Sequence, residues 1–548
     1  DAGADAYNVA IGYNAGKEVT TATANTLLGG LAGDAITTGF GNVAIGYNAL
    51  SAEDTGGTNV AIGHAALQVL DTGSNSYSVA IGYDAGKAIT TGVKNTIIGG
   101  DAGKSLTQGS NNTALGYLAL SAANGDEQYN VAIGSSSLMN LDGSGDMWNT
   151  AVGTNSGLSL TNGTLNTLIG GRAGDGLTTG SNNVAIGFDA LGAEDEHGGN
   201  VAIGYRALKV QDAGTNAYNV AIGRDAGLSV TTGETMVLMG AFAGDALTTG
   251  SSNVAIGYSA LSSEDTGQRS IAIGEGALQT QNNDANNYNV AIGHHAGHTI
   301  TTGVDNVLIG GGAGDALTTG GRNVAIGREA LSTEDETGYA VAIGYQALRA
   351  QNAGGNTYNV AIGYNAGESV TTGVDNVILG GSAGDALTTG SSNIAIGRLA
   401  LSTEDTGGRN VAVGHKALED LNYAGNGYNT AVGYEAGTAV TTGVSNTLVG
   451  ALAGDSLTTG SHNTAIGFQA LSLEDEYGFN VAIGKSALEN LNAGANAYNV
   501  AVGFSAGELM TTGTQNTIIG GLAGDALTEG KNNVAIGYSA LTAETHGE

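Results

Sequence analysis

The stretch Asn8–Gly12 reads N-V-A-I-G, and it returns with small changes along the entire chain. Its glycine serves as a marker, because the tag ends next at Gly29, Gly46, Gly63 and Gly82, at steps of 17, 17, 17 and 19 in the numbering. Four such coils make a 70-residue block, as from Gly12 to Gly82, and one block is a single position longer. The chain holds 31 copies of the tag. Because self-similarity at a fixed period is the signature of repeat architectures, this repeat decides the fold.

Each coil is patterned as a strand followed by turns. Val9 and Ile11 alternate with Ala10 and Gly12, which is the periodicity of a β-strand. Turn-forming stretches such as Thr37-Thr38-Gly39 come after it. A helical repeat is the competing reading, but glycine and β-branched residues at this density oppose helix. We therefore predict an all-β, parallel β-solenoid (a β-roll) of about 31 coils of 17–19 residues, stacked at about 4.8 Å per coil.

The organisation along the chain is uniform. We see no linker and no shift in composition, so residues 1–548 are predicted to form a single elongated solenoid domain. Neither end of the sequence shows a capping element, which solenoids ordinarily have. We therefore expect a segment of a longer fibre, uncapped at both ends.

An asparagine stands four residues before the marker glycine in 27 of the 31 coils. In a solenoid such a column places amides above one another, where they form a ladder of hydrogen bonds along the axis. We interpret the column as structural rather than as a ligand site. Its first members are Asn8, Asn25, Asn42, Asn59, Asn95 and Asn112.

The two faces of the strand are both apolar. If Val9 and Ile11 fill the interior, Ala10 and Gly12 form a nearly flat Ala/Gly-rich face on the outside, along which a partner copy can approach closely. A long exposed apolar strip is unusual for a monomer and favours self-association. The alternative is that the small residues face the interior of a very thin roll.

Composition excludes several classes of protein. The formal net charge of −33 argues against nucleic-acid binding, which needs clustered Lys and Arg. There is no cysteine for a disulfide framework, and 41% hydrophobic residues argue against disorder. No apolar run reaches the roughly 20 residues of a membrane helix, so we expect no membrane insertion within this segment.

The N-[VT]-A-[IV]-G tag, for example at Asn183–Gly187, resembles the head repeats of trimeric autotransporter adhesins (YadA-like), and it is also similar to glycine-rich phage tail-fibre repeats. The resemblance covers essentially the whole chain. It implies a parallel β-roll whose copies pack side by side and bind surfaces. The coils of this chain are longer than those of the adhesin family, and no coiled-coil stalk is seen.

Carboxylates recur by block, and two columns of them begin with Asp34 and with the pair Glu53-Asp54. Recurrence at every fourth coil keeps like charges about 19 Å apart, which favours solvation of the surface as their role. The more specific alternative is a calcium site made by Asp34, Glu53 and Asp54, because clusters that offer only oxygen ligands suit Ca²⁺. No other cofactor is expected.

An aromatic residue marks the longer fourth coil of each block. These rings either pack over the two extra residues or form an exposed row that contacts sugars or surfaces. The first members of the row are Tyr7, Tyr77, Trp148, Tyr218 and Tyr288.

Catalysis has little support, because an enzyme needs one unique acid/base cluster, whereas each carboxylate motif here is copied six or seven times. We expect a non-enzymatic structural subunit of an extracellular or cell-surface fibre or adhesive rod that self-associates along the Ala/Gly-rich face. The alternative is a phage tail fibre or other receptor-binding appendage on a virion surface. The expected partners are further copies of the chain and a cell-surface or carbohydrate receptor.

Overall fold

The computed structural model describes residues 5–336, 338–543 and 545. It divides into two compact units, which are described separately. The first unit holds the described residues up to Ser270 together with Asn283–Asn286, and the second holds Ile271–Asn282 and the described residues from Asn287 onward. The predicted uncapped ends involve residues 1–4 and 546–548, which lie outside the described part of the chain.

Every coil contributes one three-residue strand. The strands of the first unit are β1 Val9–Ile11, β2 Thr26–Leu28, β3 Val43–Ile45, β4 Val60–Ile62, β5 Val79–Ile81, β6 Thr96–Ile98, β7 Thr113–Leu115, β8 Val131–Ile133, β9 Thr150–Val152, β10 Thr167–Ile169, β11 Val184–Ile186, β12 Val201–Ile203, β13 Val220–Ile222, β14 Val237–Met239 and β15 Val254–Ile256. The strands of the second unit are β16 Ile271–Ile273, β17 Val290–Ile292, β18 Val307–Ile309, β19 Val324–Ile326, β20 Val341–Ile343, β21 Val360–Ile362, β22 Val377–Leu379, β23 Ile394–Ile396, β24 Val411–Val413, β25 Thr430–Val432, β26 Thr447–Val449, β27 Thr464–Ile466, β28 Val481–Ile483, β29 Val500–Val502, β30 Thr517–Ile519 and β31 Val534–Ile536.

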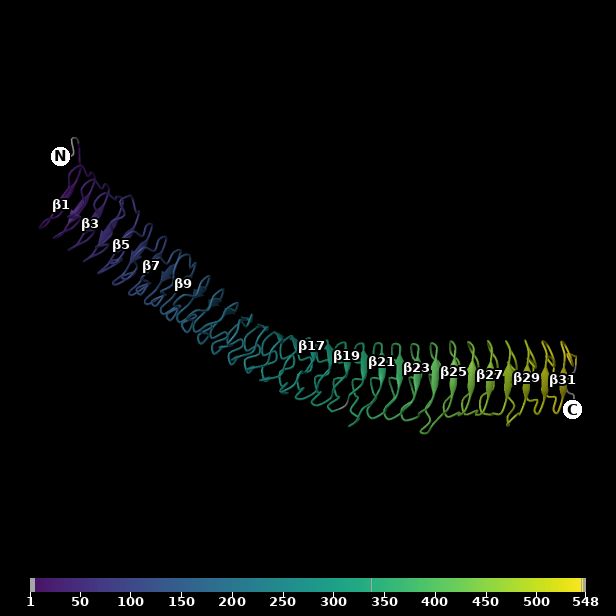
Figure 1. The fold of residues 1–548 in the computed structure, drawn as a ribbon. Helices are drawn as coiled ribbons and strands as arrows, with labels where there is room; N and C mark the ends of the chain where they lie inside the picture. Colours follow the sequence, from purple (N-terminus) through teal and green to yellow (C-terminus); the bar gives the residue numbers. More distant parts are fainter. Residues whose placement is uncertain (1–4, 337, 544, 546–548) are drawn as a thin grey trace. The chain divides into compact units, whose positions relative to one another are not determined.

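Successive strands within each unit pair in parallel and without offset (Figure 1). Between β3 and β4, for example, Val43, Ala44 and Ile45 lie opposite Val60, Ala61 and Ile62. Matching letters of the repeat therefore become neighbours along the stack. The prediction of an all-β parallel β-solenoid is confirmed, with strands that repeat at the spacing of the tag.

The marker glycine closes each strand in a conformation that other residues avoid. Gly46 has a φ of +134°, and a Cβ built on it would collide with the carbonyl oxygen of Gly63 in the next coil. The same contact recurs between Gly63 and Gly82. Only glycine allows the coils to approach this closely, which explains why the tag ends in glycine in every coil.

The strand faces are the reverse of the predicted arrangement. Ala44, in the middle of β3, is completely buried, whereas Val43 and Ile45 on either side of it are partly exposed. The predicted outer Ala/Gly-rich face is therefore wrong, and the thin-roll alternative describes the interior. The reason is space: the inner surface opposite the strand is already occupied by buried turn residues such as Ala49 and Leu50.

Side-chain sizes in the interior are matched between coils. The middle residue of β2 is Leu27 rather than alanine, and a Cβ on Gly16 or Gly33 would lie 2.6 or 2.9 Å from its methyl groups. The leucine thus fills the space that these two glycines leave open. In the third and fourth coils the strand residue is alanine, and Leu50 and Leu67 stand at the position of the two glycines. The order Gly, Gly, Leu, Leu within a block keeps the interior filled.

The described residues contain no helix that is long and apolar enough to cross a membrane.

Candidate functional site

The asparagine column lies inside the solenoid and binds consecutive coils together. Asn42 is completely buried, and its backbone N–H donates to Oδ1 of Asn25 at 2.9 Å. Its own Oδ1 accepts from the backbone N–H of Asn59 at 3.0 Å, and its Nδ2 donates to the carbonyl of Gly56 at 3.0 Å. Most steps of the ladder therefore run from backbone to side chain, with direct amide-to-amide bonds at some steps, such as Asn25 to Asn8 at 3.2 Å. These amides satisfy buried backbone groups and hold the coils in register.

The column that includes Glu53 does not lie at the surface. Glu53 is completely buried, so the solvating role predicted for this carboxylate is wrong. It occupies the place seven residues after the marker glycine, where the other coils of its block carry Val19, Ile36 and Leu70. Aligning the coils column by column exposes this signal, because a glutamate then stands at an aliphatic core position. The equivalent residues Glu194, Glu264, Glu334, Glu404 and Glu474 are also completely buried.

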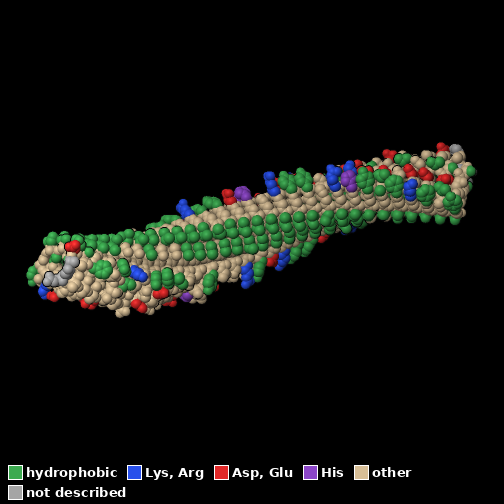
Figure 2. All heavy atoms as spheres, turned by 90° about the horizontal axis from the view of Figure 1, so that it is seen from above, with side chains coloured by type: hydrophobic (Ala, Val, Ile, Leu, Met, Phe, Trp, Pro, Cys, Tyr) green, Lys and Arg blue, Asp and Glu red, His purple; other side chains and the backbone are tan. Residues whose placement is uncertain are grey.

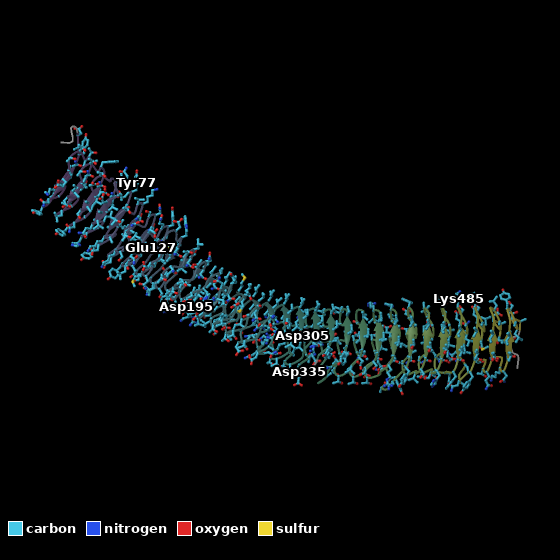
Figure 3. All side chains as sticks on the ribbon, viewed as in Figure 1. Tyr77, Glu127, Asp195, Asp305, Asp335 and Lys485 are labelled. Atoms are coloured by element: carbon cyan, nitrogen blue, oxygen red, sulfur yellow. The ribbon has the colours of Figure 1, made fainter. Side chains whose placement is uncertain are left out.

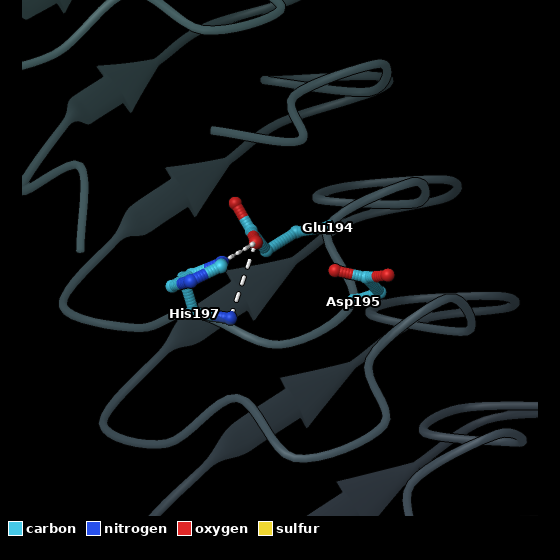
Figure 4. Close-up of side chains that lie close together, drawn as sticks. All are labelled: Glu194, Asp195 and His197. Carbon is cyan, nitrogen blue, oxygen red and sulfur yellow. Dashed lines mark hydrogen bonds and ion pairs between the residues drawn. The ribbon is translucent and has the colours of Figure 1, made fainter. Parts of the chain in front are cut away.

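Each buried glutamate closes a loop by accepting hydrogen bonds. Oε1 of Glu194 accepts from the backbone N–H of His197 at 3.2 Å and lies 3.6 Å from the Nδ1 of the same residue, and Asp195 takes no part in these bonds (Figure 4). In this block the next coil supplies Gln211, whose Nε2 donates to Oε2 of Glu194 at 3.1 Å. Gln351 makes the same 3.1 Å bond to Glu334.

Three blocks offer leucine instead of glutamine beside the buried carboxylate. Leu70, Leu421 and Leu491 stand where Gln211 stands in the block of Glu194. Burial raises the pKa of Glu53 and of Glu404, and it raises the pKa of Glu474 to about 7. Backbone N–H groups of Ala493 and Tyr477 oppose the rise at Glu474 by donating to the charged form. Ionisation of Glu474 therefore disfavours the folded state.

We expect the stability of the coils around Glu474 to fall as the pH rises. A carboxyl whose folded pKa is about 7 and whose unfolded pKa is about 4.5 contributes fully below pH 4.5, and the contribution is lost progressively between pH 4.5 and 7. The difference of about 2.5 units corresponds to about 3 kcal/mol. Glu474→Gln removes this titration, so the stability of the variant should not change for this reason. Between pH 4.5 and 7 the free energy of unfolding of the wild type should therefore fall by about 3 kcal/mol relative to that of the variant.

Hydrogen exchange of the amides in β27 and β28, recorded from pH 4 to 8 and corrected for intrinsic rates, measures the effect. Glu476→Gln, at an exposed carboxylate two residues away, is the matched control. Parallel pH profiles for the wild type and Glu474→Gln would contradict the assignment.

The predicted calcium ligands come together only in part. Among the described residues, the acidic group that includes Glu53 and Asp54 is completed by Asp71, and Asp34 is not one of its members. The Glu53 oxygens are already engaged: Oε1 accepts from the N–H of Gly56 at 2.7 Å, and Oε2 faces Thr72 at 3.4–3.5 Å. Ca²⁺ requires six to eight oxygen ligands. A carboxylate turned toward backbone donors does not fit such a site.

Asp34 stands apart from this group. Burial raises its pKa, and its buried Oδ1 has no hydrogen-bond partner among the described residues.

The aromatic row lies at the surface. The first members have exposed fractions of 50–76%, and they are Tyr7, Tyr77, Trp148, Tyr218 and Tyr288. Tyr77 is labelled in Figure 3. Some rings pack on an aromatic residue of the preceding coil, as Trp148 does on Tyr129 with ring centroids 4.1 Å apart. The rings are therefore available to a ligand on at least part of their surface.

A second surface feature was missed because the strand faces were assigned the wrong way round. The first and third residues of each strand face outward, and in all 31 strands they are Val, Ile, Thr, Leu or Met. These outward residues form a largely aliphatic face along each unit, visible as rows of hydrophobic side chains (Figure 2), with threonine at the first position of nine strands. No charged residue interrupts it in the described strands.

No model of a known protein family matches the chain, and neither does any curated protein.

Proposed function

We propose that this chain is a structural, non-catalytic subunit of an extracellular fibre or adhesive surface rod, and that its copies associate side by side through the aliphatic face. The observation that carries the proposal is this face, which is continuous along each unit and bears no charge. Monomeric soluble proteins rarely expose apolar patches of more than a few hundred Å². A second copy of the same surface offers a matching uncharged partner.

Repetition supports a structural role. The buried glutamates, the asparagine ladder and the exposed rings all recur along the chain, whereas a catalytic site requires one constellation of reacting groups. The resemblance of the N-V-A-I-G tag to adhesin head repeats points the same way. An extracellular location follows from that role and belongs to the proposal.

The aliphatic face can be tested by adding charge to it. Ile362 and Ile396 lie on the face with exposed fractions of 36% and 37%, so lysine at either position can reach solvent without disturbing the interior. In the variant Ile362→Lys/Ile396→Lys, association through this face would bury the lysine charges. We therefore expect the association constant to fall at least tenfold. Sedimentation velocity over a range of protein concentrations measures it.

The control variant adds the same charge elsewhere. Thr372→Lys/Thr389→Lys places two lysines on exposed loops of the β21 and β22 coils and should associate like the wild type. A wild type that stays monomeric at every concentration, or equal weakening by both variants, would refute association through this face.

A further inference from the structure

Two surface grooves occupy equivalent places, two blocks apart in the sequence. The groove in the first unit has a volume of about 370 Å³, and Thr179, Glu196, Asn216 and Tyr218 are among its lining residues. The groove in the second unit has a volume of about 270 Å³ and is lined by residues that include Thr319, Glu336, Asn356 and Tyr339. Both grooves thus combine a hydroxyl, a carboxylate, a carboxamide and a tyrosine ring.

The same hydrogen bonds shape this part of the coil in two blocks. In the first unit the N–H of Gly198 donates to Oδ1 of Asn216 at 2.9 Å. In the second unit the N–H of Gly478 donates to Oδ1 of Asn496 at 3.2 Å, and Asn496 stands two blocks beyond Asn356 of the second groove. Each bond fixes the carboxamide with its NH₂ group remaining as a donor. The residues around Glu476 repeat this hydrogen bond, with Phe479 at the place of Tyr339, and they are a third candidate site.

The blocks between these copies differ. Glu196, Glu336 and Glu476 follow the Glu-Asp pair of the third coil in their blocks, whereas Thr266 and Thr406 stand at that place in the intervening blocks. The carboxylate that lines the groove is thus a feature of alternate blocks, and the stacking of the coils does not require it.

Each groove carries an exposed aromatic ring. Tyr218 is 60% exposed and lies against Gly199, where a Cβ would come within 2.8 Å of the ring. In the second unit the place of Gly199 is taken by Tyr339, whose ring lies between Tyr358, with ring centroids 5.3 Å apart, and the guanidinium of Arg322, 5.4 Å from the ring centroid, so that only the ring of Tyr218 offers a free face to a ligand. A ring beside fixed hydrogen-bonding groups suits a ligand with one apolar face and several hydroxyls.

The charges narrow the class of ligand. A carboxylate in each groove and a net charge of −33 oppose an anionic ligand. A cationic ligand is opposed in the second groove by Arg322, whose Nη1 donates to the hydroxyl of Tyr339 at 2.6 Å and so places the chain's own guanidinium there. The hydroxyl, carboxylate and carboxamide groups that both grooves contain suit an uncharged molecule that donates and accepts hydrogen bonds.

We propose that these grooves bind neutral saccharides through sugar hydroxyl groups on the glutamate and asparagine, with the sugar ring also resting against Tyr218 in the first unit. The inference rests on the proposed adhesive role, because it names the ligand class of that role. Eight coils separate the Glu336 and Glu476 sites within the second unit, a distance of about 38 Å along the stack. Repeated sites of this kind give multivalent attachment to a glycan surface.

An array of neutral oligosaccharides, probed with the full chain, tests the inference, and isothermal titration calorimetry with the strongest array member gives the affinity. We expect binding at about three sites per chain and at least a tenfold loss of affinity in Glu196→Gln/Glu336→Gln/Glu476→Gln. These carboxylates are exposed, so the variant should fold normally. The control Glu18→Gln/Asp142→Asn/Asp375→Asn removes the same charge at other exposed positions and should bind like the wild type.

Sedimentation of the same samples reports association of the copies separately, so glycan binding and assembly can fail independently. Absence of neutral glycan binding, equal affinity for the groove variant and the wild type, or binding of polylysine in place of glycans would each overturn the inference.

Discussion

Replacing Gly363 by alanine should unfold the coils around β21 and β22. Gly363 has a φ of +145°, and its new Cβ would lie 2.5 Å from the carbonyl oxygen of Gly380 in the next coil. The backbone of the neighbouring coil has no room to retreat because it is bonded on its other side as well. Together the strained backbone and the clash should cost about 4–5 kcal/mol. Hydrogen exchange measures the loss of protection in these two strands.

Gly355→Ala is the matched control, eight residues earlier in the chain. A Cβ at Gly355 would meet nothing within 4 Å, and its φ lies outside the positive region. Stability in a solenoid is roughly a sum of coil and nearest-neighbour terms, so the loss in Gly363→Ala should stay local. Equal protection of β21 and β22 in the two variants would show that the coils are spaced more widely than described.

Truncating Asn376 to alanine should be the second most damaging change. Asn376 is completely buried; its Oδ1 accepts from the N–H of Asn393 at 2.9 Å and its Nδ2 donates to the carbonyl of Gly390 at 2.9 Å. Alanine leaves both of these buried backbone groups without a partner, at about 1–3 kcal/mol each. We expect a loss of about 2–6 kcal/mol, measured by hydrogen exchange of β22 and β23.

A graded comparison separates the ladder from simple packing. Ser78 stands naturally in the column, and its Oγ accepts from the N–H of Asn95 at 3.4 Å. Asn376→Ser keeps an acceptor of this kind and should lose less stability than Asn376→Ala. Asn352→Ala, at an exposed position, should be nearly neutral. If serine and alanine were equally damaging, hydrogen bonding would not be the main contribution of the column.

The solenoid architecture was predictable from the sequence because it depends on the spacing of the repeated tag rather than on the packing of individual side chains. A tag that recurs at a nearly constant spacing specifies parallel stacking, and the column of Asn25 and Asn42 then has to lie along the axis. The aromatic residues of the fourth coil could be listed from the alignment of the coils, but whether they pack or are exposed could not be decided from it. These inferences need only the alignment of one coil with the next.

The faces of the strand were not predictable from the tag alone. A segment such as Val43-Ala44-Ile45 is apolar on both sides, so alternation gives no sign of which side is inside. The decision depends on the volume that the turn already occupies, which includes Leu50 and the buried Glu53. Glu53 was predicted at the surface for a related reason, because a carboxylate in a turn is usually exposed. Only the alignment of the coils shows that the other coils carry aliphatic residues at its position.

The matching of Leu27 to Gly16 and Gly33 has a consequence for how such a chain can change in length. Removing only the second coil would leave a void beside Gly16, and duplicating it would crowd two leucines against one gap. A whole set of four coils can be gained or lost without either defect. The smallest unit of growth by recombination is therefore the 70-residue block, and variants of different length should differ by multiples of it.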